Sequence, residues 1–266
     1  ILAPLLGLWD ADRLGMRLFT LFVLGAALAV SVLSLLRCKA GILNFDYIQW
    51  SADSAANGDA IASVFRVTYA SELFKVLFLS VGFLAVLGLG RPLKGRAEED
   101  FGEFCSLILF AILGMTIVAS AQELFTLLLG IEMASMSSYL LAGFRRDTVG
   151  AEASLKYFVV GAISSGLMLF GISLLYGMAG TTTLPGIAAH LTAGGSFDKL
   201  SLIPIAFLLA GLGFKISSVP FPPSAPYVFP GAPPAVAGLL SAGTTANGCF
   251  KKVNQTGGTS YPANNV

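Results

Sequence analysis

The chain has 266 residues, of which 55% are hydrophobic and only 12% are charged, and its mean hydropathy is +0.80. This balance lies far from that of soluble domains and indicates that lipid is the main solvent of the protein. The formal net charge of +1 gives no support for nucleic-acid binding.

Six apolar stretches are long enough to cross a bilayer core of about 30 Å, which takes about 20 residues. They run over residues 17–36, 72–90, 104–121, 124–144, 153–177 and 200–219. Residues 228–250 are a weaker seventh candidate, because glycine, proline and threonine interrupt the apolar run. We therefore predict an all-α, polytopic transmembrane helical bundle that forms a single integral membrane domain over residues 1–266.

The remaining segments are too short or too polar to span. Residues 1–9 are apolar and are expected to be the end of a clipped helix. In the connection 181–199, the spacing of Ile187 and Leu191 suits a short surface helix. Residues 251–266 are rich in asparagine, glycine and threonine and are predicted to be an irregular tail.

Small residues recur in the predicted span 153–177. Gly161, Gly166 and Gly171 lie on either side of the pair Ser164 and Ser165. Glycine is common where membrane helices pack closely, so we expect this span to make close contacts with its neighbours.

Ionisable residues within a span cost about 2.5–3.5 kcal/mol on insertion scales and are therefore candidate functional residues. Glu132 lies deep in its predicted helix, about 12 Å from the start at 1.5 Å per residue, where its side chain cannot reach the membrane surface. The alternative interpretation is a carboxyl group that is protonated or paired for packing alone.

A second candidate is Lys156, which lies one helical turn after Glu152 on the same face of its helix. Such a pair stabilises any helix, so Glu152 is a possible supporting residue. The alternative is an interfacial lysine whose side chain extends to the membrane surface.

The third candidate, Lys215, follows a long apolar run and precedes Pro220, which removes a backbone donor and breaks a helix. We predict a broken helix near Lys215–Pro220, with Ser217, Ser218 and Pro220 as possible supporting residues. Unwound backbone at membrane depth is tolerated where it lines protein or a wet cavity, and transporters place ion sites at such breaks. The alternative is a lysine that reaches the interface near a helix end.

These residue types suit proton transfer. Burial disfavours the charged form of a lysine, whereas a neighbouring carboxylate favours it. A buried lysine whose carboxylate partner approaches and withdraws can therefore capture and release a proton. We expect Glu132, Lys156 and Lys215 to carry protons.

The sequence offers little for other chemistry. Cys38, Cys105 and Cys249 have no CxxC spacing and His190 is the one histidine, which is too few ligands for an iron–sulfur or zinc site. No nucleophile–base constellation or phosphate-binding glycine loop is present. We expect no catalytic, cofactor-binding or metal-binding residue in this chain.

Several motifs resemble the antiporter-like membrane subunits of complex I. The likeness is closest to subunit N of NADH:quinone oxidoreductase, whose counterparts are subunit 2 in mitochondria and the equivalent subunit of the plastid-type complex. The motifs, in order, are GMTIVASAQELFTLLLGIE at 114–132, LLGIEMASMSSYLLAGF at 128–144, EASLKY at 152–157, LLYGMAGTTTL at 174–184 and FKISSVPF at 214–221.

This resemblance implies roles for the three candidates. Glu132 falls on the family's glutamate of the fifth helix, Lys156 on the lysine of the sixth, and Lys215 on the lysine of the broken seventh. It implies a proton channel driven by quinone reduction in neighbouring membrane-arm subunits. Those partners would hold quinone, NAD(P)H or ferredoxin, flavin and iron–sulfur clusters, and this chain would hold no redox centre.

The sequence departs from the family after Phe221. The family's histidine, tryptophan and aspartate are missing from residues 222–233, and Thr245 stands where the family has a lysine. The downstream lysine helices are absent, so we expect only about half of the family fold, with one of the two inverted half-channels missing. A truncated or altered copy, or an incorrectly assigned C-terminal part, would each explain this.

The leading interpretation is a proton-translocating subunit of a proton-pumping oxidoreductase in a bacterial plasma membrane, mitochondrial inner membrane or thylakoid. Two alternatives remain. One is a subunit of a multisubunit cation/proton antiporter or membrane-bound hydrogenase, which share these lysines by resemblance. The other is a structural membrane subunit whose buried charges only pair helices.

Overall fold

Helices make up nearly all of the part of the chain that the structure describes. This computed structural model describes residues 13–39, 64–65, 69–88, 101–144, 147–193 and 201–215. The helices are α2 (Arg13–Lys39), α5 (Tyr69–Gly88), α6 (Phe101–Ser120), α7 (Leu124–Ala142), α8 (Thr148–Ala179), α9 (Leu184–Ala193) and α10 (Leu202–Lys215). Across these ranges the only extended pairing is two isolated bridges, so the fold is an all-α bundle as predicted.

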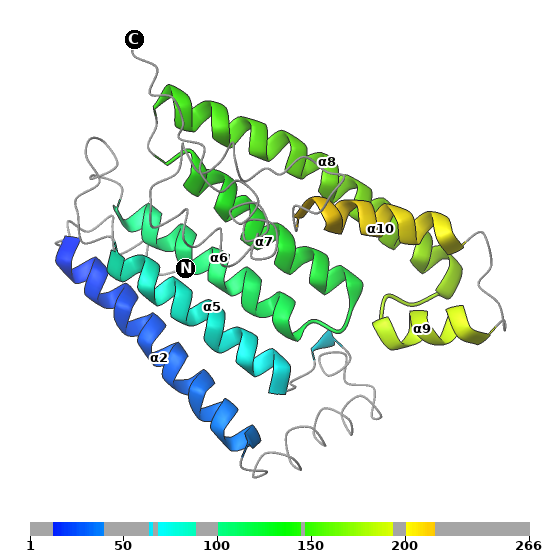
Figure 1. Ribbon diagram of the computed structural model, residues 1–266, viewed down its shortest axis with the longest axis horizontal. Coiled ribbons are helices and arrows are strands. Elements are labelled where there is room, and N and C mark those ends of the chain that lie inside the picture. The colour runs from blue at the N-terminus through cyan, green and yellow to red at the C-terminus, as the bar shows by residue number, and fades with distance from the viewer. Residues whose placement is uncertain are drawn as a thin grey trace, which may run out of the picture.

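The five long helices α2, α5, α6, α7 and α8 lie side by side, each antiparallel to the next (Figure 1). All five are long and apolar enough to cross a membrane. We call the face where α8 begins the Thr148 face, and the face where α6 ends the Ser120 face. The shorter α10 starts at the Ser120 face, packs on α8 and stops beside the middle of α7 (Figure 1).

Several predicted segments lie outside the described residues. They are the stub 1–9, the weak span 228–250, the tail 251–266 and residues 216–220, where the helix break is predicted. The short helix expected around Ile187 is α9.

Two capping residues explain the length of α8. Asp147 precedes the helix and its side chain accepts a hydrogen bond from the Gly150 amide at 2.7 Å, as N-cap residues do. Gly180 ends the helix at a φ of 67°, where glycine is favoured. The 32 residues between them measure about 48 Å at 1.5 Å per residue, which exceeds the hydrocarbon core.

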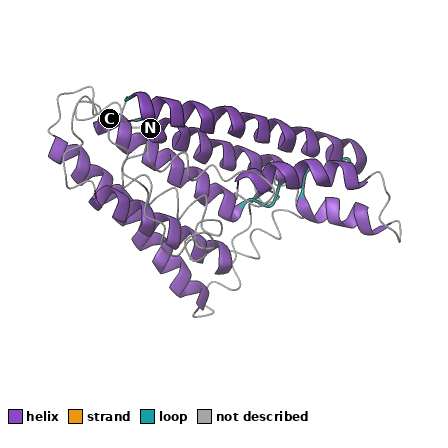
Figure 2. Cartoon of the chain, turned by 45° about the horizontal axis from the view of Figure 1, so that its top comes forward, coloured by secondary structure: helices purple, strands orange, loops and turns teal. Residues whose placement is uncertain are grey.

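Short loops join the helices at the Ser120 face (Figure 2). Glu123 connects them, because its carboxylate accepts hydrogen bonds from Thr126 at 3.0 Å and from Thr182. The backbone of Glu123 also pairs with Thr183, which brings α9 to the start of α7. These contacts fix the end of the bundle from which α10 enters.

Two apolar clusters hold the helices together. The first joins α2, α5, α6 and α7 around the buried side chains of Leu24, Phe104 and Ile108. The second joins α7 and α8 to α9 and α10, with Met168 and Leu175 at its centre. The candidate lysine and glutamate of α10 and α7 therefore belong to the second half of the layer.

α10 approaches α8 closely because the contact surface carries two glycines. A Cβ atom on Gly171 would lie 2.9 Å from the backbone of α10, and one on Gly211 would lie 2.7 Å from the carbonyl oxygen of Ser164. The Ser164 hydroxyl donates a 2.8 Å hydrogen bond to the Gly211 carbonyl. Small residues and interhelical hydrogen bonds are the usual basis of close packing in membranes. This contact sets the depth of Lys215, one turn further along α10.

A methyl group at Gly211 is expected to push α10 away from α8. We expect Gly211→Ala to destabilise the protein by about 1–3 kcal/mol, as overpacking does. The measurement is thermal unfolding of the detergent-solubilised assembly, followed by loss of its size-exclusion peak. Gly166→Ala on α8 is the matched control, because nothing lies within 4 Å of a Cβ atom there. Equal melting temperatures for the two variants would contradict this view of the contact.

Candidate functional site

The ammonium group of Lys215 lies among three oxygen atoms of α7. Its Nζ is 2.9 Å from the Ser135 hydroxyl, 3.0 Å from the Tyr139 hydroxyl and 3.3 Å from Oε1 of Glu132. The lysine side chain is only 12% exposed. Lysine has three donors and no acceptor, so three oxygens match its capacity.

One face of α7 supplies all three partners. Residues three and four apart lie on the same side of a helix, so Glu132, Ser135 and Tyr139 form a single row. Ser135 and Tyr139 are buried at 6% and 4% exposure, respectively. The row thus brings one carboxylate and two hydroxyl groups into the interior of the helical layer.

Glu132 is also bound from α8. Ser165 donates a hydrogen bond to the same Oε1 atom that faces Lys215. The Ser165 hydroxyl also lies 2.9 Å from the carbonyl oxygen of Gly161, one turn earlier. A hydroxyl carries one proton, so Ser165 serves one of these acceptors at a time. The carboxylate can therefore lose this hydrogen bond without leaving the serine proton unpaired.

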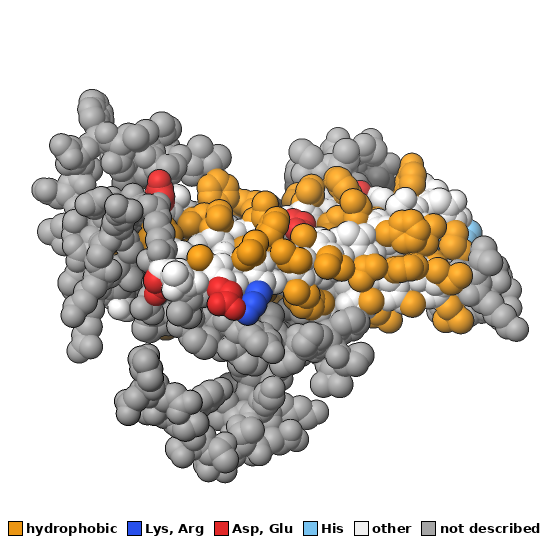
Figure 3. Space-filling view, turned by 90° about the horizontal axis from the view of Figure 1, so that it is seen from above, with side chains coloured by type: hydrophobic (Ala, Val, Ile, Leu, Met, Phe, Trp, Pro, Cys, Tyr) orange, Lys and Arg blue, Asp and Glu red, His pale blue; other side chains and the backbone are white. Residues whose placement is uncertain are grey.

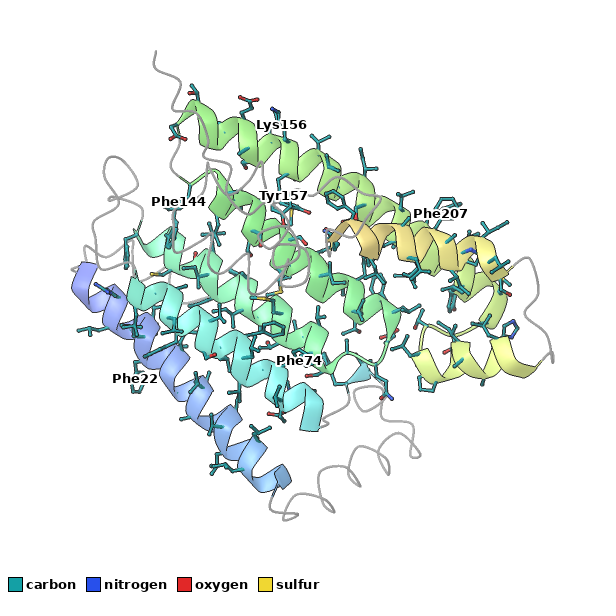
Figure 4. The ribbon with its side chains drawn as sticks, in the orientation of Figure 1. Phe22, Phe74, Phe144, Lys156, Tyr157 and Phe207 are labelled. Atoms are coloured by element: carbon teal, nitrogen blue, oxygen red, sulfur yellow. The ribbon has the colours of Figure 1, made fainter. Side chains whose placement is uncertain are left out.

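Tyr139 is positioned by α8. Its hydroxyl occupies the space beside Gly161, where a Cβ atom would lie 1.9 Å from that oxygen. Its ring meets the Tyr157 ring edge to face, with the centroids 4.6 Å apart (Figure 4). Ser154 donates a 2.8 Å hydrogen bond to the Tyr139 carbonyl. The Lys215 Nζ lies 5.6 Å from the Tyr139 ring centroid, within the range of a cation–π contact.

Lys156 lies elsewhere. It points away from the layer on the outer side of α8 (Figure 4), with its side chain 58% exposed, and pairs with Glu152 one turn earlier. Hydrophobic side chains cover much of the face around α8, and adjoining acidic and basic side chains interrupt them (Figure 3). The structure therefore brings Glu132 and Lys215 together but leaves Lys156 and Glu152 outside this cluster.

Sequence reasoning did not single out Ser135, Tyr139 or Ser165 as partners of the charged groups. A signal for the first two was present, because they lie three and seven residues after Glu132 and so share its helix face. Ser165 comes from another helix, and only the packing of α8 on α7 reveals its contact. Ser217, Ser218 and Pro220 lie outside the described residues.

The described residues offer no alternative centre for metal chemistry, since they contain no group of three or more His, Cys, Asp or Glu side chains placed to hold an ion. What the cluster can do is hold and pass protons. It combines a carboxylate, an amine and hydroxyl groups that both donate and accept hydrogen bonds.

Comparisons with known proteins agree with this geometry. The family described as NADH:quinone oxidoreductase/Mrp antiporter, TM, matches residues 121–250, which contain the whole cluster. The chain is 42% identical over 177 residues to NADH-quinone oxidoreductase subunit N of Trichlorobacter lovleyi, covering 66% of this chain and 36% of that protein. It is 40% identical over 182 residues to F(420)H(2) dehydrogenase subunit N of Methanosarcina mazei, covering 67% of this chain and 36% of that protein.

A solved structure is similar as well. A chain of respiratory complex I from Thermus thermophilus with bound aureothin superimposes with a TM-score of 0.53 at 29% identity, covering 84% of this chain and 52% of that one. The present chain thus spans little more than a third of the two curated relatives. From the motifs, the fold and these relatives, the chain belongs to the NADH:quinone oxidoreductase/Mrp antiporter family of transmembrane subunits.

Proposed function

We propose that this chain is a proton-translocating membrane-arm subunit of a complex I-type NAD(P)H or ferredoxin:quinone oxidoreductase. The observation that carries the proposal is the 3.3 Å approach of the Lys215 ammonium to the Glu132 carboxylate inside the helical layer. Its likeness to subunit N of NADH-quinone oxidoreductase supports the assignment. An ionic pair at this depth is costly to keep and marks ion pathways in membrane proteins.

The pair gives a simple cycle of proton transfer. While Glu132 is ionised, its charge stabilises the Lys215 ammonium. When a proton neutralises Glu132, the ammonium loses that partner and more readily releases its own proton. The hydroxyls of Ser135 and Tyr139 can hold both forms of the lysine, because a hydroxyl accepts from an ammonium and donates to a neutral amine.

Partner subunits of the assembly would drive this cycle. In this proposal the chain lies in an energy-transducing membrane beside other membrane-arm subunits. The partners reduce quinone with electrons from NAD(P)H or ferredoxin through flavin and iron–sulfur clusters, while this chain moves protons only. The chain is then part of an enzyme, a proton-pumping NADH:quinone oxidoreductase, without holding its redox chemistry.

Lys156 and Glu152 are proposed as a separate station nearer the Thr148 face. Lys156 precedes Ser165 by nine residues of α8, about 13 Å at 1.5 Å per residue, so it does not exchange protons directly with the inner cluster. An ion pair exposed to lipid would be costly, which favours a partner subunit or water beside it in the assembly. Ser217, Ser218 and Pro220 are proposed to support Lys215 from the following segment.

A second candidate function follows from the family itself, whose description includes Mrp antiporters. The chain would then belong to a multisubunit cation/proton antiporter or a membrane-bound hydrogenase, with the same Lys–Glu pair. Mass spectrometry of the gently solubilised native assembly distinguishes the two. Quinone-reducing and iron–sulfur partners support the oxidoreductase, and antiporter partners alone support the alternative.

Removing either member of the inner pair should stop proton transport. In the reconstituted assembly, we expect Lys215→Met or Glu132→Gln to abolish proton uptake, measured with a pH-sensitive dye in proteoliposomes. Each single variant leaves a partner unpaired, and breaking a buried pair costs about 3–5 kcal/mol. Assembly is therefore expected to fall as well.

The double variant Lys215→Met with Glu132→Gln separates transport from stability. It leaves no unpaired charge and is expected to restore assembly, measured by blue native electrophoresis, but not pumping. Full pumping by the double variant would leave the pair a purely structural role and sink the proton-pathway proposal.

The Tyr139 hydroxyl should matter without its ring. Tyr139→Phe keeps the edge-to-face contacts and removes a hydrogen bond to a charged group, worth about 1.5–3 kcal/mol. We expect the pumping rate to fall about tenfold with normal assembly. Tyr176→Phe is the control, because Tyr176 lies on the same family of helices but is 55% exposed. An unchanged rate for both variants would remove Tyr139 from the pathway.

The outer pair should contribute less than the inner pair. Exposed ion pairs contribute about 0.2–1 kcal/mol, so we expect Lys156→Met to slow pumping by no more than about fivefold. The same dye assay measures it beside Lys215→Met. If Lys156→Met stopped pumping completely while the complex assembled, Lys156 would be an obligatory station of equal rank with Lys215.

A further inference from the structure

A second polar feature lies outside the Glu132–Lys215 cluster, in a groove where α2, α5 and α6 meet. The groove has a volume of about 430 Å³, within the range of about 300–1,000 Å³ usual for small-molecule sites. Lys75 of α5 lines it, and Phe65 lies at its edge. We call it the Lys75 groove.

Polarity changes along the Lys75 groove. Toward the Ser120 face its lining carries the Lys75 ammonium and the hydroxyls of Ser31, Thr116 and Ser120. Deeper in the layer the lining is entirely hydrocarbon. The deeper residues are Val23, Leu24, Ala27, Leu79, Leu109, Ile112 and Leu113. The groove is therefore polar near the membrane surface and apolar toward the midplane.

The Lys75 groove opens sideways. Leu24, Leu79 and Ile112 are buried at its base, at 2%, 6% and 3% exposure, whereas Val23 and Leu113 are 37% and 47% exposed. Exposed apolar side chains of a membrane-spanning helix face the bilayer or a partner. A molecule could thus enter from the bilayer, without passing through water.

The ammonium of Lys75 keeps donors available. It donates a 2.9 Å hydrogen bond to Glu72 one turn earlier, whose side chain is only 7% exposed and does not line the groove. An ammonium has three donors, so one bond to Glu72 leaves others for a second acceptor. The 20% exposure of the Lys75 side chain gives that acceptor access.

We infer that the Lys75 groove binds one phospholipid, with the lipid phosphate at Lys75 and an acyl chain along the apolar part. The charges are complementary, because the anionic phosphate meets an ammonium. The order of polar and apolar groups matches that of a phospholipid in its leaflet. A water-filled channel fits poorly, since a buried water needs 2–4 polar partners and the deep lining provides none.

The test is native mass spectrometry of the full assembly, purified from nanodiscs of phosphatidylglycerol. Ser31→Trp fills the groove, and Val30→Trp is its matched control, since the neighbouring Val30 is 64% exposed and points out of the groove. We expect Ser31→Trp to carry one phospholipid fewer than the parent protein and Val30→Trp to carry the same number. Equal lipid counts for all three proteins would overturn the proposal.

A second variant tests the phosphate contact. Lys75→Met is combined with Glu72→Gln, so that no unpaired carboxylate remains in the fold. We expect about tenfold weaker retention of the lipid, as for the loss of one charge-assisted hydrogen bond, and recovery in the single variant Lys75→Arg. Retention equal to that of the parent protein would contradict the assignment of Lys75.

Thiol labelling distinguishes lipid from water in the groove. We expect Ser31→Cys to resist a charged, membrane-impermeant methanethiosulfonate reagent in intact proteoliposomes, as Val30→Cys does. Rapid labelling of Ser31→Cys alone would identify an aqueous cavity and refute the lipid site.

Discussion

A buried ammonium must have oxygen partners wherever the packing of its helix places it, and the Lys215 group obeys this constraint through α7. A carboxylate and two hydroxyls surround it, at 2.9–3.3 Å. The row on α7 would itself be costly without the lysine, because it places Glu132 inside the layer. α7 and α10 thus make sense only together, and the close packing of α10 is what joins them.

The helix α8 coordinates both sides of this arrangement. Gly171 and Ser164 hold α10 at a fixed depth, while Gly161 makes room for the Tyr139 hydroxyl and Ser165 binds Glu132. Four contacts along one helix therefore set the positions of the lysine, the tyrosine and the carboxylate. Changes at small residues of α8 are transmitted to the charged pair through packing, even though those residues carry no charge.

Much of this was accessible from the sequence, and the exceptions have physical reasons. Apolar length and midspan charge predicted an all-α membrane bundle and singled out Glu132 and Lys215, because both signals are local. Which glycines meet a neighbour depends on which face of α8 is covered: Gly161 and Gly171 do, and Gly166 has nothing within 4 Å. The contact of Ser165 and the outward direction of Lys156 likewise depend on helix packing, which no local pattern encodes.

The hydrogen bond between Ser165 and Glu132 also serves as a reference level across the bilayer. From it, α7 continues for ten residues to Ala142, about 15 Å, and α8 runs back to Lys156 over about 13 Å. Lys156 therefore lies almost level with the end of α7, at the hydrocarbon boundary of the Thr148 face, whereas Lys215 lies at the reference level itself. The two lysines consequently differ in their access to bulk protons: one can equilibrate with the adjoining aqueous phase, and the other depends on its neighbours for every exchange.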